Sequence, residues 1–185
     1  MPKLRAIGYS ELGLEIDNSL QGNVDKYLRG DIDRESLVRS MGPLYRNYES
    51  QIDIIDAAIE NQMNVHCFDT YFNSQDYLYG ETRDRKQFTK LKERIFDKKP
   101  NSKLAIFCGA YHANEKPTRS RRMVNLPYQE TLGCYLNSYT KGKNVSACFL
   151  DEYEINYEVF DYILENMDFY LNKSGKDLLV FKKKE

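Results

Sequence analysis

Four polar residues in this sequence have the types and positions from which a hydrolytic site can be built. His112 follows an apolar run and a glycine in "IFCGAYHA", and a neutral imidazole can act as a general base or a metal ligand near neutral pH. Glu15 and Asp69 each end an apolar run, where a carboxylate can orient a histidine or a water molecule. Arg83 can bind an anionic group or an oxyanion through paired hydrogen bonds. Together they predict a pocket in which His112 is the base.

These residues also have structural interpretations. The histidine could hydrogen-bond a loop carbonyl, and the two carboxylates could cap a helix or stabilise a turn. Arg83 could pair with Glu81 or Asp84 at the start of a helix. The other histidine, His66, lies inside an apolar run, and alternation along a strand places its ring on the same face as Phe68. We therefore expect a structural role for His66.

Two cofactors are compatible with these residue types. His112, Glu15 and Asp69 could supply three ligands to a divalent metal ion, but their spacing in the sequence does not bring them together, and we predict no metal site. Haem takes tyrosine or histidine as an axial ligand, and several tyrosines follow the apolar runs. These tyrosines are Tyr71, Tyr77, Tyr79 and Tyr111.

Strands that alternate with helices must position these residues. Short apolar or alternating runs predict strands at residues 4–16, 63–70, 103–110, 145–150 and 177–181. Apolar residues at helical spacing predict helices at about 20–28, 34–41, 43–59, 83–98, 126–139 and 157–167. Polar and aromatic segments without a clear period predict loops at 70–82 and 111–125.

This order of elements predicts an α/β fold. Strands joined by helices form β-α-β units, so we expect a mainly parallel sheet of about five strands, flanked by helices, in a single domain over residues 1–185. Ligands of such sheets bind beyond the carboxyl ends of the strands. Glu15, Asp69 and His112 all fall at or just past those ends.

Composition excludes several classes of function. The 27 basic and 28 acidic residues nearly balance, so no general attraction to nucleic acid is expected. The cluster of Arg119, Arg121 and Arg122 could bind phosphate, but a solvated loop is the favoured interpretation. No apolar run approaches the roughly 20 residues of a membrane-spanning helix, and the first residues do not resemble a cleaved signal peptide.

The four cysteines are far apart and have no metal-type spacing. Three of them, Cys67, Cys108 and Cys148, lie in apolar runs predicted as strands, where a free cysteine usually packs as a small apolar side chain. Cys134 lies outside those runs. We therefore expect the cytoplasm or another reducing compartment.

Four segments, taken in order, resemble a known group of proteins. They are "LGLEIDNSLQGNVDKYLRGDI", "VHCFDT", "ETRDRKQFTKLKERI" and "KLAIFCGAYHA". In these segments the chain resembles the ChaN-like proteins, the erythromycin esterases and the wider Tiki superfamily. The resemblance covers about residues 10–182. The resemblance implies a pocket in which Glu15 is the acidic residue after a strand, Arg83 and Asp84 are a loop-to-helix pair, and His112 is the late histidine.

The resemblance implies different activities in different branches. Esterase-like members activate water for attack on an ester, ChaN-like members are associated with haem, and the Tiki branch with metal-dependent peptide cleavage. This chain lacks the family's Gly-Glu-x-x-His motif before Glu15. Three explanations are open. The chain could be the C-terminal part of a larger domain, or a second copy or a second chain could supply the missing strand. It could also be a member that keeps the scaffold for binding without the hydrolytic chemistry.

Overall fold

The computed structural model describes seven parts of the chain, which form two compact units, Met1–Phe107 and Cys108–Glu185. In the first unit an all-parallel sheet of three strands is flanked by helices, so the predicted α/β class with parallel strands is confirmed. Among the described helices, none has both the length and the apolar character of a membrane span. The described residues are 1–42, 48–70, 82–109, 111–117, 129–143, 146–149 and 178–181.

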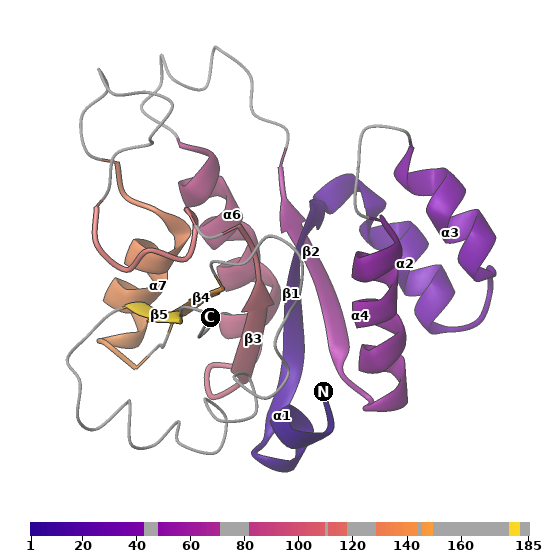
Figure 1. Ribbon diagram of the computed structural model, residues 1–185, viewed down its shortest axis with the longest axis horizontal. Coiled ribbons are helices and arrows are strands. Elements are labelled where there is room, and N and C mark those ends of the chain that lie inside the picture. The colour runs from indigo at the N-terminus through magenta and orange to yellow at the C-terminus, as the bar shows by residue number, and fades with distance from the viewer. Residues whose placement is uncertain are drawn as a thin grey trace. The chain divides into compact units, whose positions relative to one another are not determined.

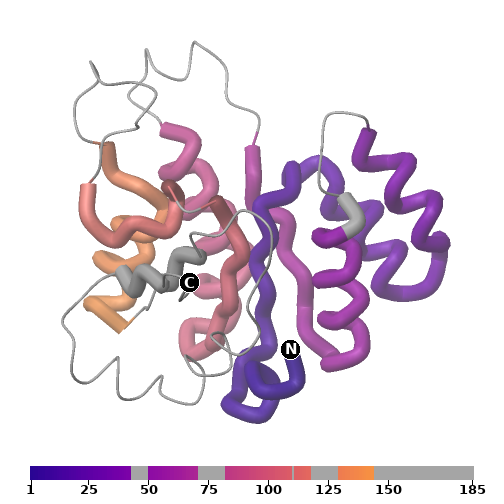
Figure 2. Tube along the Cα trace, in the orientation of Figure 1, coloured from indigo at the N-terminus to yellow at the C-terminus, as the bar shows by residue number. Residues whose placement is uncertain are grey.

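The first unit is built around strand β1 (Tyr9–Asp17), which lies between β2 (Asn64–Asp69) and β3 (Lys103–Phe107), as Figure 1 shows. The chain enters the sheet at its centre, crosses to the edge strand β2 and returns to the opposite edge at β3 (Figure 2). The prediction of a strand from residue 4 is wrong at its start, because Pro2–Ala6 form helix α1. Proline at the first helical position suits a helix start, since its fixed φ is already helical.

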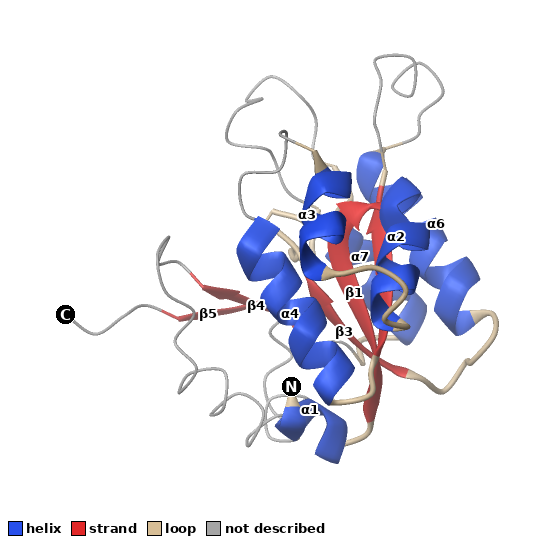
Figure 3. Cartoon of the chain, turned by 90° about the vertical axis from the view of Figure 1, so that its right-hand side faces the viewer, coloured by secondary structure: helices blue, strands red, loops and turns tan. Residues whose placement is uncertain are grey.

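One face of the sheet packs against the helices that follow β1. Leu12, Leu14 and Ile16 alternate along β1 and are at most 2% exposed, and they form one apolar core with Ile52 and Ile55. Figure 3 shows these helices in front of the sheet. They are the 3-10 helix η1 (Asn18–Leu20) and the α-helices α2 (Gln21–Leu28), α3 (Arg34–Met41) and α4 (Tyr48–Glu60).

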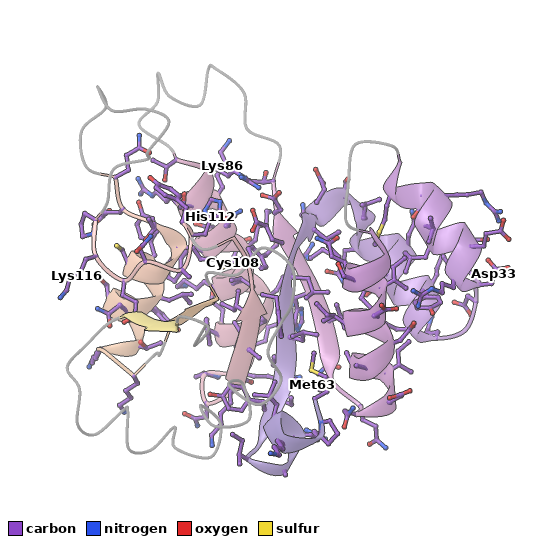
Figure 4. All side chains as sticks on the ribbon, viewed as in Figure 1. Asp33, Met63, Lys86, Cys108, His112 and Lys116 are labelled. Carbon is purple, nitrogen blue, oxygen red and sulfur yellow. The ribbon has the colours of Figure 1, made fainter. Side chains whose placement is uncertain are left out.

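Local contacts set where these elements begin. Asp33 precedes α3, and its carboxylate accepts a hydrogen bond from the backbone N–H of Ser36 at 2.8 Å, as a helix cap does. Met63 lies just before β2 and is 4% exposed in the core (Figure 4, which labels Asp33 and Met63). The predicted helix at 34–41 is confirmed, whereas the predicted start of the next helix at 43 lies outside the described residues.

The opposite face of the sheet packs against helix α6 (Arg83–Leu91), which continues as the π-helix η2 (Lys92–Phe96). Gly13 lies at the centre of this face in a closely packed position, because a Cβ atom there would lie 3.3 Å from Phe68 and 3.4 Å from Leu91. The absent side chain lets α6 approach the strand closely.

The outer edge of β2 is covered by side chains. Gln21 Oε1 accepts a hydrogen bond from the Cys67 N–H at 2.7 Å, and its Nε2 donates to the Val65 carbonyl at 2.9 Å. Arg94 Nη1 donates to the Cys67 carbonyl at 2.8 Å. Because these are the backbone groups through which another strand would pair, the sheet is closed to extension at this edge.

In the second unit, helix α7 (Leu132–Thr140) precedes β4 (Ser146–Phe149), which pairs in parallel with β5 (Leu178–Phe181). The predicted helix at 126–139 begins later than expected, because Thr131 caps it by accepting a hydrogen bond from the Cys134 N–H. Several predictions lie outside the described residues: the loop over 71–81, the arginine cluster, and the helix at 157–167.

Candidate functional site

Three of the four predicted site residues lie together at the carboxyl ends of β1 and β2. We call Glu15, Asp69 and Arg83 the Arg83 cluster. Arg83 binds both oxygens of Asp69, with Nε 2.8 Å from Oδ1 and Nη2 2.6 Å from Oδ2. The same Nη2 lies 2.9 Å from Oε1 of Glu15. Parallel strands bring two carboxylates to one edge of the sheet, and the first residue of α6 supplies the cation.

Asp69 is the most tightly held member of the cluster. Its Oδ1 also accepts hydrogen bonds from Gln87 Nε2 and from the Thr70 N–H, both at 2.8 Å. Burial on its own raises the pKa of Asp69, but the hydrogen bonds from Arg83 and Gln87 outweigh it and the pKa lies below its ordinary value. The hydrogen bond to Asp69 likewise raises the pKa of Arg83. Asp69 is therefore an ionised anchor, not a proton acceptor, at neutral pH.

The cluster becomes more accessible from Asp69 to Arg83. The side chain of Asp69 is 13% exposed, that of Glu15 is 20% exposed and that of Arg83 is 36% exposed. Asp84, which is 7% exposed, adds a third carboxylate whose charge acts on Arg83. Arg83 is therefore acted on by three carboxylate charges, and Glu15 is the more exposed of the two carboxylates that bind it.

His112 is described within the second unit. Its N–H donates to the Gly109 carbonyl at 2.9 Å, and its carbonyl accepts from the Gly133 N–H at 2.8 Å. Residue 133 must be glycine, because a Cβ atom would lie 2.4 Å from the Asn114 carbonyl oxygen. The Tyr111 ring meets the imidazole edge-on, with ring centroids 5.6 Å apart (His112 is labelled in Figure 4). The start of α7 thus fixes the backbone that carries the histidine.

A second polar cluster, which the sequence analysis did not identify, lies on the α6 side of the sheet near the amino ends of the strands. It consists of Glu11, Asn64, His66 and Lys99, and we call it the Glu11 cluster. Glu11 is only 1% exposed. Its Oε2 lies 2.8 Å from His66 Nε2, and its Oε1 accepts from Lys99 Nζ at 2.9 Å and from Asn64 Nδ2 at 3.2 Å.

Burial and hydrogen bonding set the charges of this pair. Burial lowers the pKa of His66 more than the charge of Glu11 raises it. For Glu11, burial raises the pKa, but hydrogen bonds from His66 and Lys99 together outweigh it and the pKa is lowered. At neutral pH the pair is therefore a carboxylate and a neutral imidazole, so Nε2 carries the proton that Glu11 accepts.

One signal in the sequence could have revealed Glu11. Alternation along "YSELGLEID" places Glu11, Gly13 and Glu15 on one face of β1 and the leucines on the other. A buried acidic residue in a strand requires a cationic or hydrogen-bonding partner. The partner Lys99 is 88 residues away in the sequence, and only the fold reveals it.

The predicted cofactor ligands are described only in part. Tyr111 lies beside His112, whereas Tyr71, Tyr77 and Tyr79 fall outside the described residues. Within the described ranges, no group of three or more His, Cys, Asp or Glu side chains is arranged to bind a metal ion.

The cysteines differ in their surroundings. Cys67 is fully buried in β2, where burial raises the pKa of its thiol to about 12. Cys134 is buried in α7, and Cys108 is half-buried one residue beyond β3, so the prediction that places Cys108 within a strand is wrong by one position. All three are free thiols.

Comparison with known proteins adds no relative: no family model, curated protein or solved structure matches this chain. The resemblance to the erythromycin esterase, ChaN and Tiki group therefore stays a prediction from the sequence motifs.

Proposed function

We propose that the chain is a hydrolase-like domain of the erythromycin esterase, ChaN and Tiki type, with its ligand site at the carboxyl ends of β1 and β2. The observation that carries the proposal is the convergence of Glu15, Asp69 and Arg83 from three separate segments of the sequence. In α/β sheets this edge is where ligands bind. The ligand in this proposal is a small molecule or a peptide.

Each residue has a distinct role in the proposal. Glu15 contacts the ligand or the attacking water, because it is the more accessible of the two carboxylates. Arg83 is a positioning residue that holds Glu15, and Asp69 anchors Arg83. His112 takes a proton from water as the oxygen attacks the carbonyl carbon, and it returns that proton to the leaving group.

Loss of the imidazole tests the catalytic part of this proposal. Wild type and His112→Ala are compared on nitrophenyl esters of different acyl length and on a chromogenic peptide. Loss of a general base is expected to reduce kcat/KM by at least about 100-fold. Circular dichroism verifies that the variant is folded, and His66→Asn is the matched control that removes the other histidine. Equal turnover by wild type and His112→Ala would overturn the role of His112.

A second candidate function is ligand binding without catalysis. The observation that favours it is that the side chains of the Arg83 cluster already hydrogen-bond one another. Arg83 binds two carboxylates, and Asp69 accepts hydrogen bonds from three residues. Haem is the first ligand to test, by titration and the Soret band. A shifted Soret band that is lost in His112→Ala or Tyr111→Phe would support haem binding, and an unshifted band would dismiss it.

We also propose that the sheet extends beyond β3 to about five strands in a single domain. The covered edge of β2 supports extension at β3, because Gln21 and Arg94 occupy the pairing groups on the other side. If the missing strand comes from a second copy, the chain is a homodimer in solution. A monomeric mass by light scattering would rule out that dimer. We further propose the cytoplasm or another reducing compartment, because the three cysteines Cys67, Cys108 and Cys134 are free thiols.

A further inference from the structure

An open cavity of about 330 Å³ lies at the amino ends of β1 and β3, away from the Arg83 cluster. It is formed by the residues before and at the start of β1 and by the loop that leads into β3. Its polar side chains are cations, hydroxyls and one amide, and no carboxylate belongs to the lining. They are Ser10, Lys99, Asn101, Ser102 and Lys103.

Lys103 gives the cavity an unbalanced positive charge. Its Nζ donates to the Ile7 carbonyl at 2.8 Å and lies 5.9 Å from the centroid of the Tyr9 ring. Neither partner carries a negative charge, and no carboxylate pairs with Lys103 within the described part of the chain. An ammonium group that donates only to a carbonyl has further N–H bonds available for an anion.

Lys99 connects the cavity to the Glu11 cluster. The lysine side chain is 58% exposed, while the Glu11 carboxylate that it binds at 2.9 Å is 2% exposed. Ser10, which also lines the cavity, donates from Oγ to Glu11 Oε1 at 3.2 Å. The negative charge of Glu11 is therefore beneath the cavity and already occupied, and the accessible charges are the two lysines.

We propose that this cavity binds a tetrahedral oxyanion of the phosphate or sulfate type. Lys103 supplies the principal charge, Ser102 and Asn101 supply neutral hydrogen bonds, and Lys99 reorients from Glu11 toward the anion. A tetrahedral oxyanion has acceptors on every side, which suits donors that approach from both the strand ends and the loop. The site is independent of the proposed hydrolytic function, since it shares no residue with the Arg83 cluster.

His66 provides a reporter of anion binding that does not depend on knowing the natural ligand. The groups that act on its imidazole are Glu11 from β1, Arg94 from η2, and Lys99. When the anion draws Lys99 away, His66 loses one neighbouring positive charge. The protonated imidazole is then less disfavoured, so the pKa of His66 rises. The titration midpoint of His66 should then move to higher pH in saturating sulfate, a probe whose charge is constant over the histidine range.

The binding test is a phosphate titration of the whole chain, followed by NMR at constant ionic strength. Saturable shifts at residues 99–103 are expected. Lys103→Gln should weaken binding at least about tenfold, the usual effect of losing a charge-assisted hydrogen bond. Lys98→Gln is the matched control, because Lys98 is exposed in the same loop region and does not line the cavity. This control should bind as wild type does.

Ser102→Asp provides a second test that needs no loss of a lysine. A carboxylate placed in the cavity should abolish binding and leave the fold intact, as verified by circular dichroism. Shifts that do not saturate in the phosphate titration would overturn the proposal. Equal weakening by Lys103→Gln and Lys98→Gln would also overturn it, because it would reduce the effect to general charge.

Discussion

Glu11 and Glu15 lie on the same face of β1, yet they belong to two different electrostatic environments. Glu11 is at most 2% exposed and is surrounded by donors from β2 and from the loop before β3, so the accessible charges near it are lysines. Glu15 is 20% exposed and shares one guanidinium with Asp69, so two carboxylates at this end are balanced by one cation that is itself 36% exposed. Two residues of identical type thus create a donor-rich amino end and an acceptor-rich carboxyl end on one sheet.

The difference shows that exposure and partner count decide what a carboxylate does. A buried carboxylate with four donors has no remaining capacity for a ligand, and it contributes to stability. A partly exposed carboxylate that shares its cation can exchange partners with a ligand. Stability and titration measurements on matched variants distinguish these two kinds of carboxylate.

The largest effect is expected from removing the buried carboxylate. Glu11→Ala leaves a cavity and removes the acceptor of His66 and Lys99, so it should lower the free energy of unfolding by about 2–4 kcal/mol. Glu15→Ala is the matched variant and should cost about 1 kcal/mol or less, because its ion pair is partly exposed. Urea unfolding measures both. Equal losses would contradict the contrast between the two ends.

The next effect concerns the residue between the two glutamates. Gly13→Val places two methyl groups against Phe68, Leu91 and Ile106, whose atoms already lie 3.3–3.4 Å from an added Cβ. Overpacking of this kind should cost about 2–3 kcal/mol. Gly13→Ala should lower the free energy of unfolding by less, because each neighbouring side chain need move only slightly. Thermal unfolding of the two variants tests the order, and a more stable Gly13→Val would refute the close packing of α6.

The pH dependence of stability should show the titration of the Glu11 cluster. Burial lowers the pKa of His66 from its ordinary 6.5, so the unfolded chain takes up the proton first and stability falls as pH decreases below 6.5. Glu11 has a pKa below its ordinary 4.5, so its contribution is present above pH 4.5 and is lost as pH falls through the folded-state pKa.

Urea unfolding between pH 7.5 and about pH 2.5 separates the contribution of His66 from that of the carboxylates. In His66→Gln the loss that begins below pH 6.5 should disappear, while the later loss from carboxylates such as Glu11 and Asp69 remains. Identical pH profiles for wild type and His66→Gln would show that His66 is not buried as a neutral imidazole.

The smallest effect on stability is expected at the carboxyl end. Arg83→Lys keeps the charge but cannot bind both oxygens of Asp69 and reach Glu15 with one planar group. Because the guanidinium is 36% exposed, we expect a loss of about 1 kcal/mol or less. Arg85→Lys, on an exposed position of the same helix, is the control and should be neutral. A larger loss of unfolding free energy in Arg83→Lys than in Glu11→Ala would contradict the contrast between the two ends of the sheet.

The fold class followed from the sequence because period-2 and period-3.6 patterns are local. "VHCFD" and the amphipathic spacing of α3 indicate a strand and a helix without any knowledge of the partners. Alignment at one sheet edge also follows from parallel strands, and this is why Glu15 and Asp69 were predicted to meet. The start of α7 was missed because the cap at Thr131 competes with a longer apolar pattern.

The partners of charged residues could not be derived from the sequence. Arg83 was expected to bind an anion or to pair with Glu81 or Asp84. It forms hydrogen bonds with Asp69 and with Glu15, 68 positions earlier in the chain; the charge of Asp84 also acts on it, and Glu81 lies outside the described residues. Long-range ion pairs depend on strand order, and the order β2-β1-β3 is a property of the assembled sheet. The cavity at the amino ends of the strands could not be predicted for the same reason: it is formed by residues of β1 and of the loop before β3, which only the assembled sheet brings together.

The central proposal to test is that His112 acts together with Glu15, Asp69 and Arg83. NMR titration of both histidines in wild type and in the double variant Glu15→Gln with Asp69→Asn tests it without a known substrate. The account predicts that the His112 midpoint moves to lower pH when the two negative charges are removed, while the His66 midpoint stays, because Glu11 is intact. An unchanged His112 midpoint would contradict a shared site and leave the Arg83 cluster as a binding or structural element alone.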